Sequence, residues 1–176
     1  APSTPVVARS GPAATAAPDA SPTDGPATTQ ADGPGVAVPD EGAGHVEEGS
    51  RVEYENSPPA SGPHYTRTVE YGVYEQIIPA PYWVHNLEHG AIVLLYRCPD
   101  QQESCPDVLR ELQSLYERTP PGKYGQAKLV VSQYPDLETS YAVLAWDRML
   151  ELDELDEEQV LEFYRAWVDK GPEDVP

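Results

Sequence analysis

Residues 84–96 read Val84-His-Asn-Leu-Glu-His-Gly-Ala-Ile-Val-Leu-Leu-Tyr96, a histidine-rich segment that runs directly into an apolar one. The apolar part, 91–96, is continuous and β-prone, which predicts a buried strand. Asn86 and Gly90 allow the chain to change direction sharply, so we expect the two histidines on a shaped segment just before this strand. The strand over 91–96 is the central element of the predicted fold.

Three further elements are predicted after this strand. A helix over 106–116 is indicated by Pro106 at its start and by apolar residues that recur with the period of a helix. The apolar runs 129–131 and 141–146 predict two more strands. On the other side of the strand, before residue 84, the chain is rich in turn-forming residues, with short strands expected over 51–54 and 71–74.

The last predicted helix has both of its ends marked. Asp156 is expected as its N-cap, and Gln159, three residues later, completes a capping-box pattern. Apolar residues continue to Val168, and Gly171 followed by Pro172 stops the helix. The order strand, helix, two strands, helix predicts an α+β fold, with a small antiparallel or mixed sheet, two main helices on one face and a loop-rich N-terminal part.

The chain divides at about residue 44. Residues 1–44 hold eight of the twenty prolines and no aromatic residue, so they have too little apolar surface to offset the entropy of ordering them. We expect a disordered tail or stalk there, rich in Pro, Ala, Gly, Ser and Thr. Residues 45–176 carry all the aromatic residues and are long enough for a single globular domain.

The net charge of −19 narrows the class of partner. Binding to a phosphate backbone requires a basic surface, so nucleic acid is not expected as a partner, and anionic membrane surfaces are disfavoured for the same reason. No apolar run is long enough to span a bilayer. The absence of a glycine-rich phosphate loop argues against a nucleotide, and no organic cofactor is expected.

The two cysteines, Cys98 and Cys105, are close enough in sequence for a disulfide to close a short loop. Their spacing is not that of a CxxC redox or zinc motif, which favours the structural disulfide. A disulfide is typical of an extracytoplasmic protein. The chain also begins at Ala1 without an initiator Met, and we interpret this as the removal of a signal peptide or membrane anchor.

All four histidines lie between residues 45 and 89. Imidazole is the commonest protein ligand for metals, so we predict a metal site made by His64, His85 and His89. His45, Glu88 or the only methionine, Met149, could supply a fourth ligand, which suits copper or zinc. The alternative is that each histidine simply bonds to a carbonyl or a carboxylate and fixes its loop, with Glu88 in a structural ion pair.

The segment His85-Asn-Leu-Glu-His89 matches the H-x-x-E-H pattern of inverted zinc peptidases, in which both histidines lie on one face of a helix. Prolines shortly before it and Gly90 directly after it leave room for two turns of helix at most, which disfavours a peptidase. If residues 85–89 formed a straight strand, the Cα atoms of His85 and His89 would be roughly 13 Å apart, and their imidazoles could not easily share an ion. Shared ligation therefore requires the segment to curl.

Three functions remain open, and an enzyme is the less expected class. The first is a histidine-based metal-binding domain for copper or zinc, used in binding or trafficking. The second is a structural or interaction module that the stalk presents to a partner protein or the cell envelope. Its docking patch would consist of Tyr65, Tyr71, Tyr74, Tyr82 and Trp83. The third is a small metal-dependent hydrolase in which Glu88 is the base.

Five segments together resemble a bacterial family of domains of unknown function, whose members are secreted or membrane-anchored. They are His45-Val-Glu-Glu-Gly49, Pro58-Pro-Ala-Ser-Gly-Pro-His64, Val84-His-Asn-Leu-Glu-His-Gly90, Ala145-Trp-Asp-Arg148 and Gly171-Pro-Glu173. The resemblance covers nearly all of the predicted domain. It implies that the four histidines belong to the family pattern and that the protein is extracytoplasmic, but it implies no reaction. Asp147 stands where the pattern has a small residue.

Overall fold

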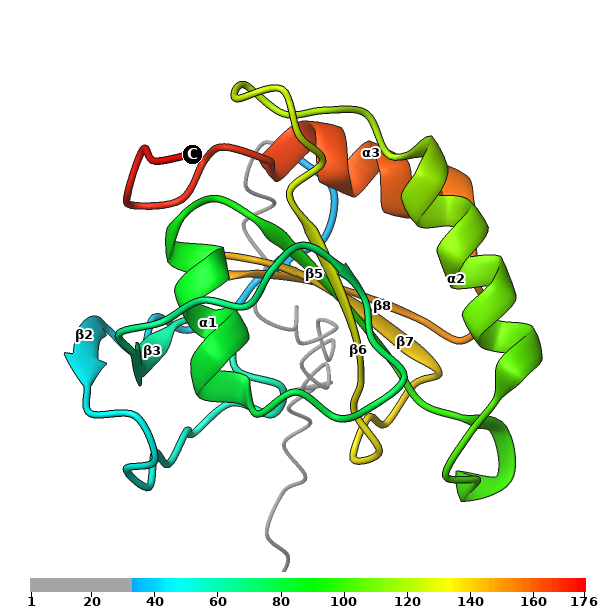
Figure 1. The fold of residues 1–176 in the computed structure, drawn as a ribbon, viewed down its shortest axis with the longest axis horizontal. Coiled ribbons are helices and arrows are strands. Elements are labelled where there is room, and N and C mark those ends of the chain that lie inside the picture. The colour runs from blue at the N-terminus through cyan, green and yellow to red at the C-terminus, as the bar shows by residue number, and fades with distance from the viewer. Residues whose placement is uncertain (1–32) are drawn as a thin grey trace, which may run out of the picture.

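The computed structural model describes residues 33–176, and the fold is α+β, as predicted (Figure 1). Its centre is a mixed six-stranded sheet: β5 and β6 run parallel to each other, as do β4 and β6, and the remaining pairs are antiparallel. In order across the sheet, the strands are β1 (Val36–Ala37), β8 (Arg148–Leu152), β7 (Tyr141–Ala145), β5 (Ile92–Tyr96), β6 (Leu129–Gln133) and β4 (Gly72–Val73).

The strand β5 lies inside the sheet and is completely buried, which confirms the prediction for residues 91–96. Because side chains alternate along a strand, β5 contributes to both faces. Ile92 and Leu94 pack in one cluster with residues of α2 (Pro106–Arg118) and α3 (Glu157–Trp167), the two helices predicted for one face. Val93 and Leu95 pack in a second cluster with α1 (Ala80–Glu88).

Helix α1 was not predicted as a regular element. The prolines before His85 predict little room for a helix. Pro81, however, lies in the first turn of α1, where a missing N–H removes no intrahelical hydrogen bond. The result is a nine-residue helix whose C-cap is His89. Trp83, Val84 and Leu87 are fully buried, so tertiary packing stabilises this short helix.

The strand assignments were correct at 71–74, 129–131 and 141–146 and wrong at 51–54, which is irregular. Strand β8 was not predicted from the sequence, because the acidic residues that begin at Glu151 interrupt its apolar pattern. It pairs with β7 along its whole length through a turn at Asp147. Asp147 has φ 55°, the left-handed region that favours small residues and tolerates Asp.

The start of the described chain is part of the fold. Val36 pairs with Met149 across β1 and β8, and the indole of Trp167 donates a hydrogen bond to the carbonyl of Pro34 at 2.9 Å. Residues 34–38 therefore contact the sheet and α3, within the stretch for which a tail is predicted. The rest of the predicted tail, 1–32, lies outside the described residues.

The ends of α3 and the two cysteines agree with the sequence. The Asp156 carboxylate accepts from the Gln159 backbone N–H at 3.0 Å, which is one half of a capping box, and from the Gln159 side-chain amide at 2.7 Å. Cys98 and Cys105 form a disulfide with Cα atoms 5.6 Å apart. Among residues 33–176, no helix is long and apolar enough to cross a membrane.

Candidate metal centre

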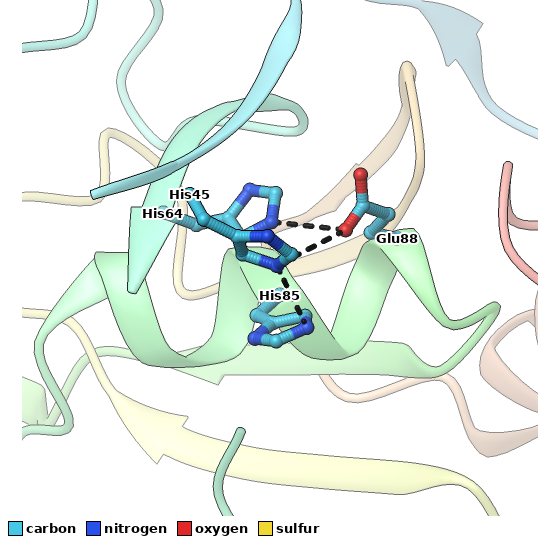
Figure 2. Close-up of side chains that lie close together, drawn as sticks. All are labelled: His45, His64, His85 and Glu88. Carbon is cyan, nitrogen blue, oxygen red and sulfur yellow. Dashed lines mark hydrogen bonds and ion pairs between the residues drawn. The ribbon is translucent and has the colours of Figure 1, made fainter. Parts of the chain in front are cut away.

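Three separate segments bring their polar side chains together beside α1. The strands β2 (Ala43–Val46) and β3 (Gly62–Tyr65) form a parallel pair in which His45 and His64 are register partners. His85 and Glu88 lie three residues apart on α1 and therefore share one face of that helix. Figure 2 shows the three imidazoles and the carboxylate gathered around one point. We call His45, His64, His85 and Glu88 the three-histidine group.

The ligand atoms of this group all lie within 4.8 Å of one another. His64 Nε2 is 2.9 Å from Glu88 Oε2, His45 Nε2 is 4.0 Å from the same oxygen, and His45 Nε2 is 3.4 Å from His85 Nε2. A tetrahedral ion with metal–ligand bonds near 2.0–2.1 Å has ligand atoms about 3.3 Å apart. These three distances bracket that value and the others are at most 4.8 Å, so the side chains would have to move closer together to complete a tetrahedron.

The hydrogen bonds of His64 define its tautomer. Nδ1 lies 2.8 Å from the carbonyl oxygen of Gly62, and because a carbonyl can only accept, Nδ1 carries the proton. In a neutral imidazole, Nε2 then presents a lone pair to the Glu88 carboxylate, which is also an acceptor. Two facing lone pairs are favourable only if a cation lies between them, either a proton on Nε2 or a metal ion. His64 is fully buried, so the cation between the two atoms is one of these two, a proton or a metal ion.

His85 is held in the neutral form that binds metals. Burial lowers its pKa to about 4, with smaller contributions from the neighbouring imidazoles of His89, His64 and His45. Its Nδ1 is buried and has no hydrogen-bond partner among the described residues. Because a metal competes with protons for the ring nitrogen, a neutral imidazole binds the metal without first losing a proton.

The proline-rich loop that ends at His64 is fixed by its own contacts. The carboxylate of Glu41 accepts from the backbone N–H groups of Glu55 and Asn56 at 2.8 and 2.9 Å. The Tyr54 hydroxyl donates to the carbonyl of Pro63 at 2.7 Å. Gly62 has φ 118°, and a Cβ there would lie 2.9 Å from the Tyr54 ring, so glycine is required. The loop therefore presents His64 in one orientation.

His89 lies beside this group but not in it. Its ring centroid is 4.5 Å from that of His85, while its Nε2 lies 3.3 Å from Glu173 Oε2. Burial lowers the pKa of His89, and the carboxylates of Glu173 and Glu88 partly oppose that shift. The ligand atoms of Glu88, His89 and Glu173 are within 4.8 Å of one another. We call these three residues the Glu173 group.

The candidate ligands therefore form two groups that differ from the predicted set of His64, His85 and His89. His64 and His85 do lie together, but His45 and Glu88 complete their group, and His89 faces Glu173 instead. Met149 is a core residue of β8 packed with the α1 cluster and belongs to neither group. Glu173 is a candidate ligand that was not predicted from the sequence, although it belongs to the Gly171-Pro-Glu173 segment of the family resemblance.

Comparison with known families gives a match. The family model described as "Protein of unknown function (DUF3105)" matches residues 45–175. The chain belongs to the DUF3105 family. The matched range contains every residue of both groups and begins at His45. Searches of curated proteins and of solved structures produced no significant match to this DUF3105 chain.

Proposed function

We propose that this DUF3105 protein is an extracytoplasmic metal-binding protein whose three-histidine group holds one transition-metal ion, zinc or copper(II), for binding and transfer rather than catalysis. The observation that carries the proposal is the gathering of three imidazole nitrogens and one carboxylate oxygen within 4.8 Å of one another, with the lone pair of His64 aimed at Glu88. Three neutral imidazoles and one carboxylate leave a net charge of −1, which a divalent ion more than neutralises.

The donor set supports the choice of metal. Imidazole and carboxylate suit zinc and copper(II), whereas a thioether would have favoured copper(I), and Met149 lies outside the group. His45 is the accessible ligand, since 47% of its side chain is exposed, while His64 is fully buried. A metal can therefore approach through the edge of β2 and exchange with a partner there.

Binding is favoured over hydrolysis by what surrounds the group. A metal hydrolase needs an open pocket for substrate and a free general base. None of four cavities found among residues 33–176 has a histidine in its lining, and the one of about 710 Å³ lies beside Cys98 and α2. Glu88 is engaged by His64, which supports a role as a ligand rather than as a base.

The interaction-module alternative has less support. It does not require the histidines to meet, and the four lie in adjoining groups. It also expected an exposed aromatic patch, but Trp83 is fully buried and Tyr65 is 8% exposed. The extracytoplasmic location is supported by the Cys98–Cys105 disulfide, since such bonds persist in oxidising compartments.

The decisive experiment is equilibrium dialysis of the full chain against zinc and, separately, copper(II), followed by elemental analysis. We expect tight retention of one equivalent by the wild type. His45→Gln removes an accessible ligand without opening the core and should weaken binding more than about 100-fold, beyond the usual effect of an outer-shell change. Met149→Leu is the matched control and should bind like the wild type. Retention of neither metal by the wild type would refute the proposal.

A further inference from the structure

Glu88 is a member of both groups, and this sharing carries an inference beyond a single metal ion. We propose that the Glu173 group is a second binding position for a divalent cation, adjacent to the first and joined to it by the Glu88 carboxylate. The inference rests on the proposed function, because Glu88 can bridge two cations only if the three-histidine group holds one. It assigns a role to Glu173, which a single site leaves without one.

The backbone after α3 is fastened where it presents Glu173. The Glu173 N–H donates to the carbonyl of Glu88 at 3.0 Å, and the Asp169 N–H donates to that of Gly90 at 2.8 Å. Between them, a Cβ at Gly171 would overlap the Glu88 carbonyl oxygen and the Gly90 nitrogen. Only glycine permits this close approach, so the segment lies directly against the end of α1.

A buried lysine anchors the same segment from the other side. Lys128 is 1% exposed, and its ammonium donates to the carbonyls of His89 at 3.0 Å and Val175 at 2.6 Å. Its charge is balanced by Asp169 at 3.0 Å. A buried ammonium is tolerated only when it is paired and hydrogen-bonded in this way. The backbone is therefore held in place on both sides of Glu173, and this segment supplies the Glu173 carboxylate.

The carboxylate of Glu88 has an oxygen for each position. Oε2 faces His64 at 2.9 Å and His45 at 4.0 Å, and Figure 2 shows the other oxygen pointing away from these imidazoles. Carboxylates that bridge two metals hold them about 3.5–4 Å apart in many proteins. The ring centroids of His85 and His89, one from each group, are 4.5 Å apart, which is compatible with adjacent ions.

The second position should bind more weakly and exchange faster than the first. It has three protein donors, and the side chains of His89 and Glu173 are 21% and 47% exposed, so water completes the coordination. An ion in the three-histidine group repels a second cation, and the two carboxylates only partly offset that repulsion. These properties suit a transfer position through which a divalent ion enters or leaves the inner one.

The test is a zinc titration of the full chain, with bound metal measured by elemental analysis after dialysis at a low and a high free zinc concentration. We expect one equivalent at the low concentration and a second at the high one. Glu173→Gln should abolish only the second. Asp174→Asn is the matched control, because it removes the same charge from the next residue, which pairs with Lys123, and it should keep both equivalents.

The outcomes separate this inference from the proposed function. If the wild type binds a single equivalent that Glu173→Gln leaves intact and His45→Gln abolishes, the second position is refuted and the metal-binding function stands. If the wild type binds none, both fail. His89→Gln is a second variant with the same expected loss, so a folding defect in one variant does not decide the result. Persistence of the second equivalent in both variants also overturns the inference.

Discussion

His64 Nε2 and Glu88 Oε2 lie 2.9 Å apart. Because Nδ1 of His64 donates its hydrogen bond to the Gly62 carbonyl, each of these two atoms presents an acceptor to the other. The pair is buried, with side-chain exposures of 0% and 8%. A cation between these two atoms resolves the conflict. The first prediction tests which cation occupies that place.

Glu88→Gln should keep the fold but lose the metal. The side-chain amide of glutamine can donate a hydrogen bond to Nε2 of His64. We therefore expect the unfolding free energy of the metal-free variant to be within about 1 kcal/mol of the wild-type value, which is the scale of one hydrogen bond. Zinc affinity should fall more than about 100-fold because an anionic ligand is removed. Competition with a chromophoric chelator measures this. An unchanged affinity would show that the cation at this place is a proton.

The metal-free protein should lose stability as the pH falls from about 6.5 to about 4. His85 has a folded-state pKa of about 4, below its ordinary value of 6.5, so the unfolded chain binds its proton first. The stabilising contribution is complete above the unfolded pKa and disappears as the pH approaches the folded one. Urea unfolding midpoints at several pH values measure the slope.

His85→Gln should reduce that pH dependence between about 6.5 and 4, since one of the titrating groups is gone, while His89, whose pKa is also lowered by burial, still contributes. Met149→Leu, which changes a side chain outside both groups, should retain the wild-type slope. A slope in His85→Gln equal to that of the wild type would assign the pH dependence to other groups.

Gly171→Ala should displace the segment that follows α3. The added Cβ overlaps backbone atoms of Glu88 and Gly90, which cannot move aside as a flexible side chain can. We expect a loss of roughly 1–3 kcal/mol in unfolding free energy, the usual size of an overpacking effect. Gly44→Ala is the control, because a Cβ there meets nothing within 4 Å. Equal denaturation midpoints for the two variants would contradict the close packing.

Removal of the disulfide should affect stability without affecting the metal. Closing the loop between Cys98 and Cys105, which are seven positions apart in the sequence, contributes about 2.5 kcal/mol by the chain-entropy model. The double change Cys98→Ser and Cys105→Ser should lower the unfolding free energy by about that amount. Bound zinc per chain should stay constant, because the disulfide belongs to the α2 cluster and the histidines lie beside α1. A parallel loss of zinc would show coupling between the two faces.

Much of the fold was predictable because its signals are local. The apolar run that became β5, the helical period of α2 and the Asp156 cap of α3 each specify an element within a dozen residues. The missed elements depend on remote partners. The helix α1 is short and preceded by proline, and it is stabilised by burying Trp83 and Leu87 against the sheet.

By itself, the sequence determined the chemistry available at the site: four imidazoles within a short stretch, acidic neighbours and the turn residues around them. Only the tertiary structure decided which donors meet. His45 joins the group through a parallel pairing with β3, and Glu173 reaches His89 because the last segment packs on Gly90. Such pairings join residues far apart in the chain, and local periodicity carries no information about their register.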